Sequence, residues 1–204
     1  MAFYEEVLGR YLSAEQLQEI GSWKIGLAGL GGLGSNCAVH LVRTGFRRLV
    51  LVDFDLVEPS NLNRQFYFPD QIGQAKASAL RDNLLRINPD LDLAVHQICL
   101  TRDNLDHYFH DCDIIVEAFD TPEAKQMLAA AYLHSDKLLV SASGLAGWGQ
   151  SDRIRTHRLK DRFILVGDLE TAVDATHPPL APRVQIAAAK MADAILEYVF
   201  NSKG

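Results

Sequence analysis

A glycine-rich turn between an apolar run and a helical segment constrains the fold of this chain more than any other feature. Gly29, Gly31 and Gly34 have the spacing G-x-G-x-x-G, which begins at the end of the apolar run from Ile25 to Leu30. In such a turn the glycines allow a tight bend, and the N–H groups at the start of the next helix can approach a phosphate. The sequence therefore predicts a nucleotide site at this turn, with simple close packing of a strand and a helix as the alternative.

Further apolar runs alternate with helix-length segments along the chain. Strands that are apolar at every position belong to a parallel sheet that helices cover on both faces. We therefore expect the α/β class, with a Rossmann-like, doubly wound, mostly parallel sheet and right-handed connections. The further strands are expected at Leu49 to Val52, Ile114 to Val116 and Leu138 to Val140, and the helices at Gly34 to Thr44, Gln74 to Ile87, Thr101 to His110 and Pro122 to His134.

The two ends of the chain depart from this alternation. The first residues are helical, and Ser13 and Gln16 have capping-box spacing, which predicts an N-terminal helical arm over about residues 1–22. Residues 152–158 and 163–166 predict exposed strands that extend the sheet by antiparallel strands at its C-terminal side. We see no composition break along the chain, so residues 1–204 are expected to form a single domain.

A turn-rich segment and an alanine-rich helix close the sequence. The segment from Gly167 to Pro182, here called the crossover loop, contains three prolines and several Asp and Thr residues. A loop of this length inside a compact domain is typical of a functional crossing or a lid. The helix is expected from Val184 to Phe200, because alanine has the highest helix propensity.

Composition argues against several classes of protein. The chain carries a formal net charge of −6, and its basic residues are scattered, so we expect no nucleic-acid partner. No apolar run reaches the roughly 18 residues that a membrane span needs, and the N-terminus lacks the basic segment of a signal peptide. We expect a cytoplasmic protein with no membrane partner. The cysteines Cys37, Cys99 and Cys112 form no C-x-x-C pair, so neither a zinc site nor a disulfide framework is expected.

Asp53 follows the second expected strand, about 20 residues after the glycine turn, where an acid can accept hydrogen bonds from ribose hydroxyls. The glycine turn and Asp53 alone fit an NAD-dependent oxidoreductase as well as other nucleotide-binding proteins. A dehydrogenase strand of this kind usually enters a helix soon after its acid. This chain instead continues in a polar loop over residues 54–65, which indicates a binding site for a charged ligand.

Two cations follow in this region. Arg64 offers a planar fork to phosphate oxygens, and Lys76 offers a mobile point charge that can follow a leaving pyrophosphate. Each has a structural alternative: Arg64 could pair with Asp53 or Asp55, and Lys76 could lie on a solvated helix face. The role of Asp55 stays open between a loop cap and a ligand contact.

The combined motifs resemble the ThiF/MoeB family of sulfur-carrier protein adenylyltransferases, which are related to ubiquitin-activating enzymes. The resemblance is carried by the strings G-x-G-G-L-G, D-x-D-x-V-x-x-S-N-L-x-R-Q and G-Q-x-K, by Asp120-Thr121 after an apolar strand, and by Ala181-Pro182 before the last helix. Without zinc cysteines, the chain is most similar to the short ThiF-like members.

The resemblance implies ATP-dependent adenylation of a small β-grasp, ThiS-like carrier protein. The carboxylate of its C-terminal Gly-Gly would attack the α-phosphate of ATP and give an acyl-adenylate and pyrophosphate. A carboxylate is already ionised at neutral pH, so positioning and charge neutralisation suffice for catalysis. Thiamine (thiazole) biosynthesis is our first expectation for the pathway. A molybdopterin-synthase adenylyltransferase and a tRNA dehydratase of the same superfamily are the alternatives.

The resemblance also assigns site residues. Asp120 is the implied magnesium ligand, since magnesium is often held by a single carboxylate with phosphate oxygens and water, although Asp120 could instead cap the helix that opens at Thr121. The residues implied to bind ATP are Gly29, Gly31, Gly32, Gly34, Asp53, Ser60, Asn61, Arg64, Gln65, Lys76 and Thr121. Those implied to act in catalysis are Arg64, Lys76, Asp120 and Arg10.

Arg10 is the least direct of these assignments. Many family members supply an arginine from the N-terminal segment of the neighbouring subunit, and Arg10 is the sole arginine before Arg43. If Arg10 acts in this way, the enzyme is a two-fold homodimer. A plain surface arginine is the alternative.

The position of the cysteines predicts where the reaction stops. The crossover loop, where many members carry a nucleophilic cysteine, has none. Cys37, Cys99 and Cys112 are expected on a core helix, a strand and a helix end, where buried thiols are usually inert. We therefore predict that the chain forms the adenylate without taking its partner onto a thiol.

Overall fold

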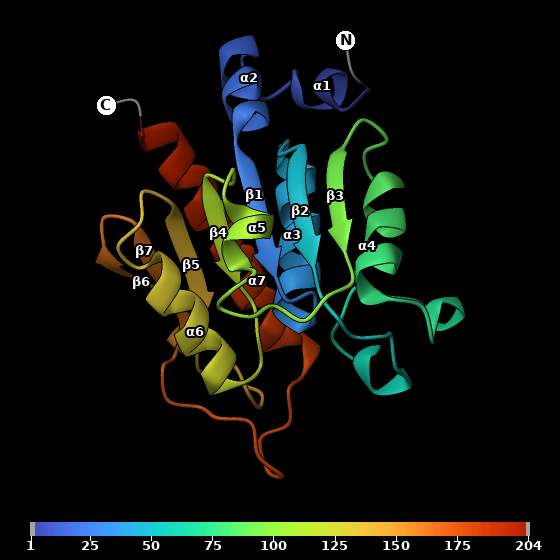
Figure 1. Ribbon diagram of the computed structural model, residues 1–204, viewed down its shortest axis with the longest axis vertical. Coiled ribbons are helices and arrows are strands. Elements are labelled where there is room, and N and C mark those ends of the chain that lie inside the picture. The colour runs from blue at the N-terminus through green and yellow to red at the C-terminus, as the bar shows by residue number, and fades with distance from the viewer. Residues whose placement is uncertain (1–2, 203–204) are drawn as a thin grey trace.

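A seven-stranded sheet with the order β3-β2-β1-β4-β5-β7-β6 forms the centre of the protein in a computed structural model (Figure 1). The structure describes residues 3–202, so residues 1–2 and 203–204 of the predicted domain, and the first two residues of the predicted arm, lie outside the described residues. The strands are β1 (Lys24–Ala28), β2 (Arg48–Val52), β3 (Asp92–His96), β4 (Ile114–Glu117), β5 (Leu138–Ala142), β6 (Arg155–Lys160) and β7 (Phe163–Gly167).

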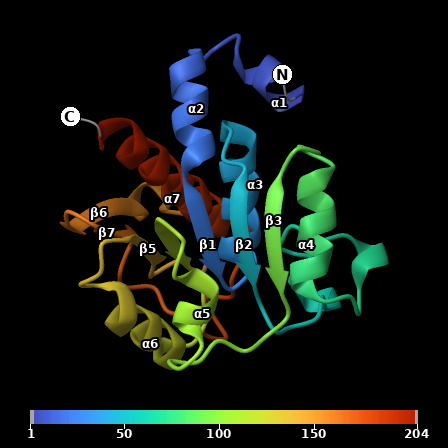
Figure 2. The same ribbon diagram turned by 45° about the horizontal axis from the view of Figure 1, so that its top comes forward.

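Helices cover both faces of the sheet, as the sequence predicts (Figures 1 and 2). Buried residues of α3, α4 and α7 pack in one hydrophobic cluster on one face, whereas those of α5 and α6 pack in a second cluster on the other. The helices are α1 (Phe3–Leu8), α2 (Ala14–Ser22), α3 (Gly32–Thr44), α4 (Lys76–Leu85), α5 (Leu105–Phe109), α6 (Pro122–Tyr132) and α7 (Ala181–Asn201). Short 3-10 helices lie at η1 (Pro59–Asn61), η2 (Pro69–Gln71) and η3 (Ser151–Arg153).

The antiparallel extension at the C-terminal side of the sheet is confirmed in a specific form. Strand β7 pairs with β5 in parallel, and only β6, at the edge, runs antiparallel to its neighbour β7. Five of the six residues of β6 are exposed, whereas β4 and β5 are buried at every position. This contrast explains why the central strands have continuous apolar runs and β6 does not.

Strand β3 and the segment after it differ from the sequence-based expectation. No strand was expected over Asp92–His96, whose side chains are mostly half-buried at the other edge of the sheet. Cys99 lies in the loop after β3 and is exposed, so its predicted place on a strand is wrong. Helix α5 is also shorter than expected, because the N–H of Thr101 donates to Oδ1 of Asn104 (2.8 Å) in a turn that precedes the helix.

The N-terminal arm lies at the end of the sheet where the parallel strands begin (Figures 1 and 2). The predicted capping box is present: Ser13 and Gln16 exchange backbone-to-side-chain hydrogen bonds at the start of α2. Glu5 of α1 forms an ion pair with Arg47 (2.6 Å), just before β2. The arm therefore lies at the strand ends opposite to those that lead into the glycine turn. None of the helices over residues 3–202 has the length and hydropathy needed to cross a membrane.

Candidate functional site

The glycine turn connects the carboxyl end of β1 to the N-terminus of α3. Gly29 adopts a positive φ of 92°, and a Cβ at this position would lie 2.8 Å from the carbonyl oxygen of Ala118. A Cβ on Gly34 would collide with the carbonyl oxygen of Gly29. The N-cap residue of α3 is Gly31, which has no side chain to occupy the first-turn N–H groups. These groups are therefore available to an anion.

Asp53 holds the glycine turn against the end of β2. Its Oδ2 accepts a hydrogen bond from the N–H of Leu30 (2.6 Å), and its Oδ1 accepts one from the N–H of Asp55 (2.8 Å). The side chain is buried, and burial raises the pKa of its carboxyl group. Each oxygen of a carboxylate can accept a further hydrogen bond, so Asp53 can still receive a ribose hydroxyl.

Arg64 lies over the first residue of α3. Its Cγ would be 3.4 Å from a Cβ on Gly32. Its Nη1 donates to the carbonyl oxygen of Ser60 (3.1 Å) and to Oδ1 of Asn63 (2.8 Å). Burial lowers the pKa of the guanidinium, and the nearby Asp120 carboxylate opposes this effect. Over residues 3–202 Arg64 forms no ion pair with Asp53 or Asp55, so that alternative is wrong. The stem of the Arg64 side chain lies beside Gly32 of the glycine turn, and its guanidinium is held by its own loop.

Lys76 begins α4 and is buried rather than solvated, so the alternative of a solvated helix face is wrong. Its Nζ lies 2.7 Å from Oδ2 of Asp55, and its N–H donates to the carbonyl oxygen of Asp55 (3.0 Å). Asp55 is thus the ion-pair partner of Lys76. To reach a phosphate, the ammonium group must leave this carboxylate.

Three other predicted ligands lie in the loop between β2 and α4. The Oδ1 of Asn61, the last residue of η1, accepts from the N–H of the N-cap residue Glu58 (3.1 Å) and so shapes this turn. Ser60 is exposed on the same turn. Gln65 is buried, and its Oε1 has no hydrogen-bond partner among the described residues. Its Nε2 would lie 3.7 Å from a Cβ on Gly31, so an unsatisfied amide faces the glycine turn and fits a polar ligand.

Asp120 lies in the turn between β4 and α6. Thr121, not Asp120, is the N-cap of α6, because its Oγ1 accepts from the N–H of Ala124 (3.4 Å). Asp120 is exposed and forms no hydrogen bond to residues 3–202. Over the same residues, no group of three or more His, Cys, Asp or Glu side chains could hold a metal ion. A single exposed carboxylate suits magnesium, which keeps water and phosphate ligands.

A buried network beneath this turn was not predicted from the sequence. Glu117, at the end of β4, is 1% exposed and accepts from Nζ of Lys125 (3.1 Å) and from the N–H of Phe119 (2.8 Å). The hydroxyl of Ser141 donates to the same carboxylate. An acidic residue at the end of an otherwise apolar strand was the available signal. The network fixes the turn that carries Asp120.

The end of the crossover loop, for which the sequence predicted a functional crossing or a lid, contacts the Arg64 segment and the glycine turn. Nδ2 of Asn63 donates to the carbonyl oxygen of Pro179 (3.1 Å). At the start of α7, Cγ1 of Val184 would lie 3.0 Å from a Cβ on Gly32. The glycine turn, the Arg64 segment and the end of the crossover loop are therefore in contact.

Arg10 is not brought to this site. It is exposed in the loop between α1 and α2. Figure 1 shows these two helices at the amino ends of the strands, opposite the ends that lead into the glycine turn. Any contribution from Arg10 would therefore have to be made to the site of a partner subunit.

Comparison with known proteins places this site in a family. The ThiF family matches residues 4–194 of the chain. The chain belongs to the ThiF family. Among curated relatives, the ubiquitin-like modifier-activating enzyme 5 of Xenopus laevis is 30% identical over 184 residues, which are 84% of this chain and 44% of that protein. The Drosophila ananassae protein of the same name is 32% identical over 185 residues, which are 85% of this chain and 44% of that protein. The chain thus spans less than half the length of these relatives.

Solved structures of other proteins share the fold. E. coli tRNA N6-threonylcarbamoyladenosine dehydratase, TcdA, in complex with AMP has a TM-score of 0.87 at 22% identity, covering 97% of this chain and 94% of that chain. E. coli MccB with ATP has a TM-score of 0.71 at 19% identity, and the match covers 90% of this chain and 58% of that chain. The ThiF resemblance and the Rossmann-like fold expected from the sequence are confirmed.

Proposed function

We propose that this ThiF-family chain uses ATP to adenylate the C-terminal carboxylate of a small ubiquitin-like carrier protein. A carrier carboxylate oxygen forms a bond to the α-phosphorus of ATP, and the bond from this phosphorus to the bridging oxygen of the β-phosphate breaks. The electron pair of that bond leaves with pyrophosphate. The observation that carries the proposal is the position of Arg64, whose side chain passes beside Gly32 in the first turn of α3 and whose charge interacts with that of Asp120.

The residues of the site have complementary tasks in this reaction. The N–H groups of the glycine turn bind phosphate oxygens, and the Asp53 carboxylate accepts hydrogen bonds from the ribose. Arg64 neutralises charge on the α-phosphate as the new bond forms. Lys76 exchanges Asp55 for the departing pyrophosphate. None of these steps requires a side-chain nucleophile, because the carrier carboxylate is itself the nucleophile.

Asp120 is the residue that would hold magnesium. When bound there, the ion would supply positive charge to the phosphate oxygens of ATP. The Glu117 network fixes the turn that carries the Asp120 carboxylate.

The relatives support ATP and a small protein partner. TcdA has been solved with ATP and with AMP, and MccB with ATP and with MccA. The curated relatives are named as activating enzymes of ubiquitin-like modifiers. Our narrower proposal is a ThiS-like carrier ending in Gly-Gly, in thiamine (thiazole) biosynthesis, and a homodimer in which Arg10 completes the partner's site.

ATP–pyrophosphate exchange tests the proposal. Exchange of labelled pyrophosphate into ATP is expected only when a carrier ending in Gly-Gly is present, because the carboxylate is the attacking group. The matched control is the same carrier with an amidated C-terminus, which should give no exchange. Separate arms measure NADH binding by fluorescence and ATP turnover with tRNA containing N6-threonylcarbamoyladenosine. No exchange with any Gly-Gly carrier contradicts the proposal, and activity in either other arm supports an oxidoreductase or a tRNA dehydratase instead.

Cys99→Ser is expected to leave exchange within about twofold of the unchanged chain. Burial raises the pKa of the Cys37 and Cys112 thiols to about 12, so neither supplies a thiolate at neutral pH. Cys99 is exposed and is therefore the thiol whose reactivity has to be tested. Intact mass spectrometry without reductant, after incubation with ATP and carrier, should show no covalent enzyme–carrier adduct. An adduct that disappears in Cys99→Ser would show that the reaction continues past the adenylate.

A further inference from the structure

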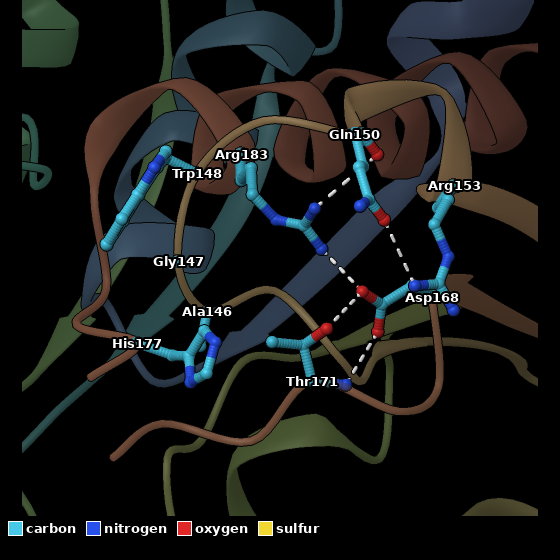
Figure 3. A pocket seen from close by; sticks show the side chains of 9 residues that line it. All are labelled: Ala146, Gly147, Trp148, Gln150, Arg153, Asp168, Thr171, His177 and Arg183. Carbon is cyan, nitrogen blue, oxygen red and sulfur yellow. Dashed lines mark hydrogen bonds and ion pairs between the residues drawn. The ribbon is translucent and has the colours of Figure 1, made fainter. Parts of the chain in front are cut away.

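A polar pocket of about 220 Å³ lies between the crossover loop and the connection from β5 to β6 (Figure 3). Trp148 and His177 line it together with Asp168, Thr171 and Arg183. None of these residues belongs to the nucleotide site described above. Figure 3 shows the guanidinium of Arg183 extending toward Asp168 and Gln150.

Arg183 and Asp168 form a buried ion pair in this pocket. Nη2 of Arg183 lies 2.5 Å from Oδ2 of Asp168, and the two side chains are 5% and 1% exposed. Nη1 of Arg183 donates to the carbonyl oxygen of Gly149 (2.9 Å). Asp168 in turn accepts from the N–H of Thr171 (2.8 Å). One guanidinium thus joins the β5–β6 connection, the start of the crossover loop and the first turn of α7.

The backbone beside Asp168 requires such a clamp. Leu169 has a φ of 65°, which is uncommon for any residue other than glycine. Burial acts to raise the pKa of Asp168, but hydrogen bonds from Thr171, Glu170 and Arg183 hold it well below its usual range. The carboxylate therefore stays ionised and keeps the turn in place.

The chemistry of the pair points to positioning rather than to stability alone. A buried ion pair adds little net stability, because desolvation offsets the attraction between the charges. Here Nε of Arg183 is also buried without a partner among the described residues. What the forked guanidinium provides is a fixed distance between two backbone segments.

This clamp is coupled to the nucleotide site through contacts on both sides. Val184, the residue after Arg183, packs toward Gly32 of the glycine turn, and Pro179 accepts a hydrogen bond from Asn63. The N–H of Gly147 donates to the carbonyl oxygen of Pro178 (2.9 Å). Loss of the clamp would release the crossover loop from the face beside Arg64 without removing a group that touches ATP.

We propose that Arg183 is a positioning residue, which acts through Asp168 and Gly149 to hold the crossover loop in the geometry that admits the second substrate, the C-terminus of the carrier. The proposal rests on the adenylation function proposed above. It predicts that loss of the Arg183 clamp raises the KM for the carrier and leaves the Kd for ATP unchanged.

Arg183→Ala is expected to raise the KM for the carrier at least tenfold and to leave the Kd for ATP within twofold. Arg183→Lys should also raise this KM, because one ammonium group cannot bond both Asp168 and Gly149 in the geometry of the fork. Arg153→Ala is the matched control: Arg153 lines the same pocket, but its ion pair with Glu170 is exposed, so both constants should stay within twofold. An equal rise in the KM for the carrier and the Kd for ATP, or an unchanged KM for the carrier, would overturn the proposal.

Hydrogen–deuterium exchange of the protein without carrier provides a second readout. Arg183→Lys should speed exchange of residues 144–150 and 168–180 and leave residues 24–53 unchanged. This variant keeps the positive charge, so it serves if Arg183→Ala fails to fold. Unchanged exchange in both segments would show that Arg183 does not order the loop and would overturn the proposal. If the unchanged chain shows no pyrophosphate exchange with any carrier, the proposed function and the positioning role fail together, while deuterium exchange still decides whether the clamp exists.

Discussion

Arg64→Ala should reduce carrier-dependent pyrophosphate exchange by roughly 10²- to 10³-fold, the loss typical of removing one preorganised group that stabilises charge in a transition state. In the structure, Arg64 is only half-buried and its hydrogen bonds go to Ser60 and Asn63 within its own loop. The fold should therefore survive the substitution. Initial rates of exchange at saturating ATP and carrier measure the effect, and circular dichroism confirms that the variant is folded.

Two variants sharpen this test. Arg64→Lys should recover only part of the activity, because an ammonium group cannot bind two phosphate oxygens side by side. Arg81→Ala removes a half-buried arginine of α4 that pairs with Asp82, and it should leave exchange unchanged. If Arg64→Ala stays within threefold of the unchanged chain, the assignment of Arg64 to the phosphates is wrong.

Gly34→Ala is expected to destabilise the fold strongly. The added Cβ would collide with the carbonyl oxygen of Gly29, so either the glycine turn after β1 or the first turn of α3 must move. Both are buried in the centre of the protein, where overpacking costs about 3 kcal/mol. We expect this loss in the free energy of unfolding, measured with urea, and a loss of ATP binding measured by calorimetry.

Gly31→Ala is the matched control for this prediction. Gly31 has a φ of −72°, and its added Cβ would meet Nε2 of Gln65 at an ordinary distance of 3.7 Å. Its ψ of −150° lies outside the regions that residues with a side chain usually adopt, so the free energy of unfolding should fall by only about 1 kcal/mol. Equal destabilisation by both substitutions would mean that the loss reflects the general cost of alanine in the turn rather than the close approach at Gly34.

The parts of the fold that are set by residues close together in the sequence were predictable. The glycine turn, the central strands and the capping box of Ser13 and Gln16 all have local signatures, because spacing along the chain sets their geometry. Strand β3 escaped prediction because it lies at the sheet edge, where half-buried side chains leave no continuous apolar run.

The site residues show the same division. Asp53, Arg64 and Asp120 were predicted from motifs; the structure places Asp53 and Arg64 beside the glycine turn and Asp120 in the turn after β4. Their partners were not predictable, because the bonds that matter join distant segments. The hydrogen bond from Asn63 to Pro179 and the ion pair of Arg183 with Asp168 arise only when the crossover loop folds back. A single sequence carries no signal for either pairing.

Helix α1 and the last turn of α7 both lie at the amino ends of the parallel strands, away from the carboxyl ends that lead into the glycine turn (Figure 1). A surface tether or fluorescent label attached near either helix would therefore leave the carboxyl ends of the strands open to solution. Capture of a carrier protein could then be followed on the immobilised chain, with ATP supplied in the flow, and the binding and dissociation rates of the two substrates could be measured separately.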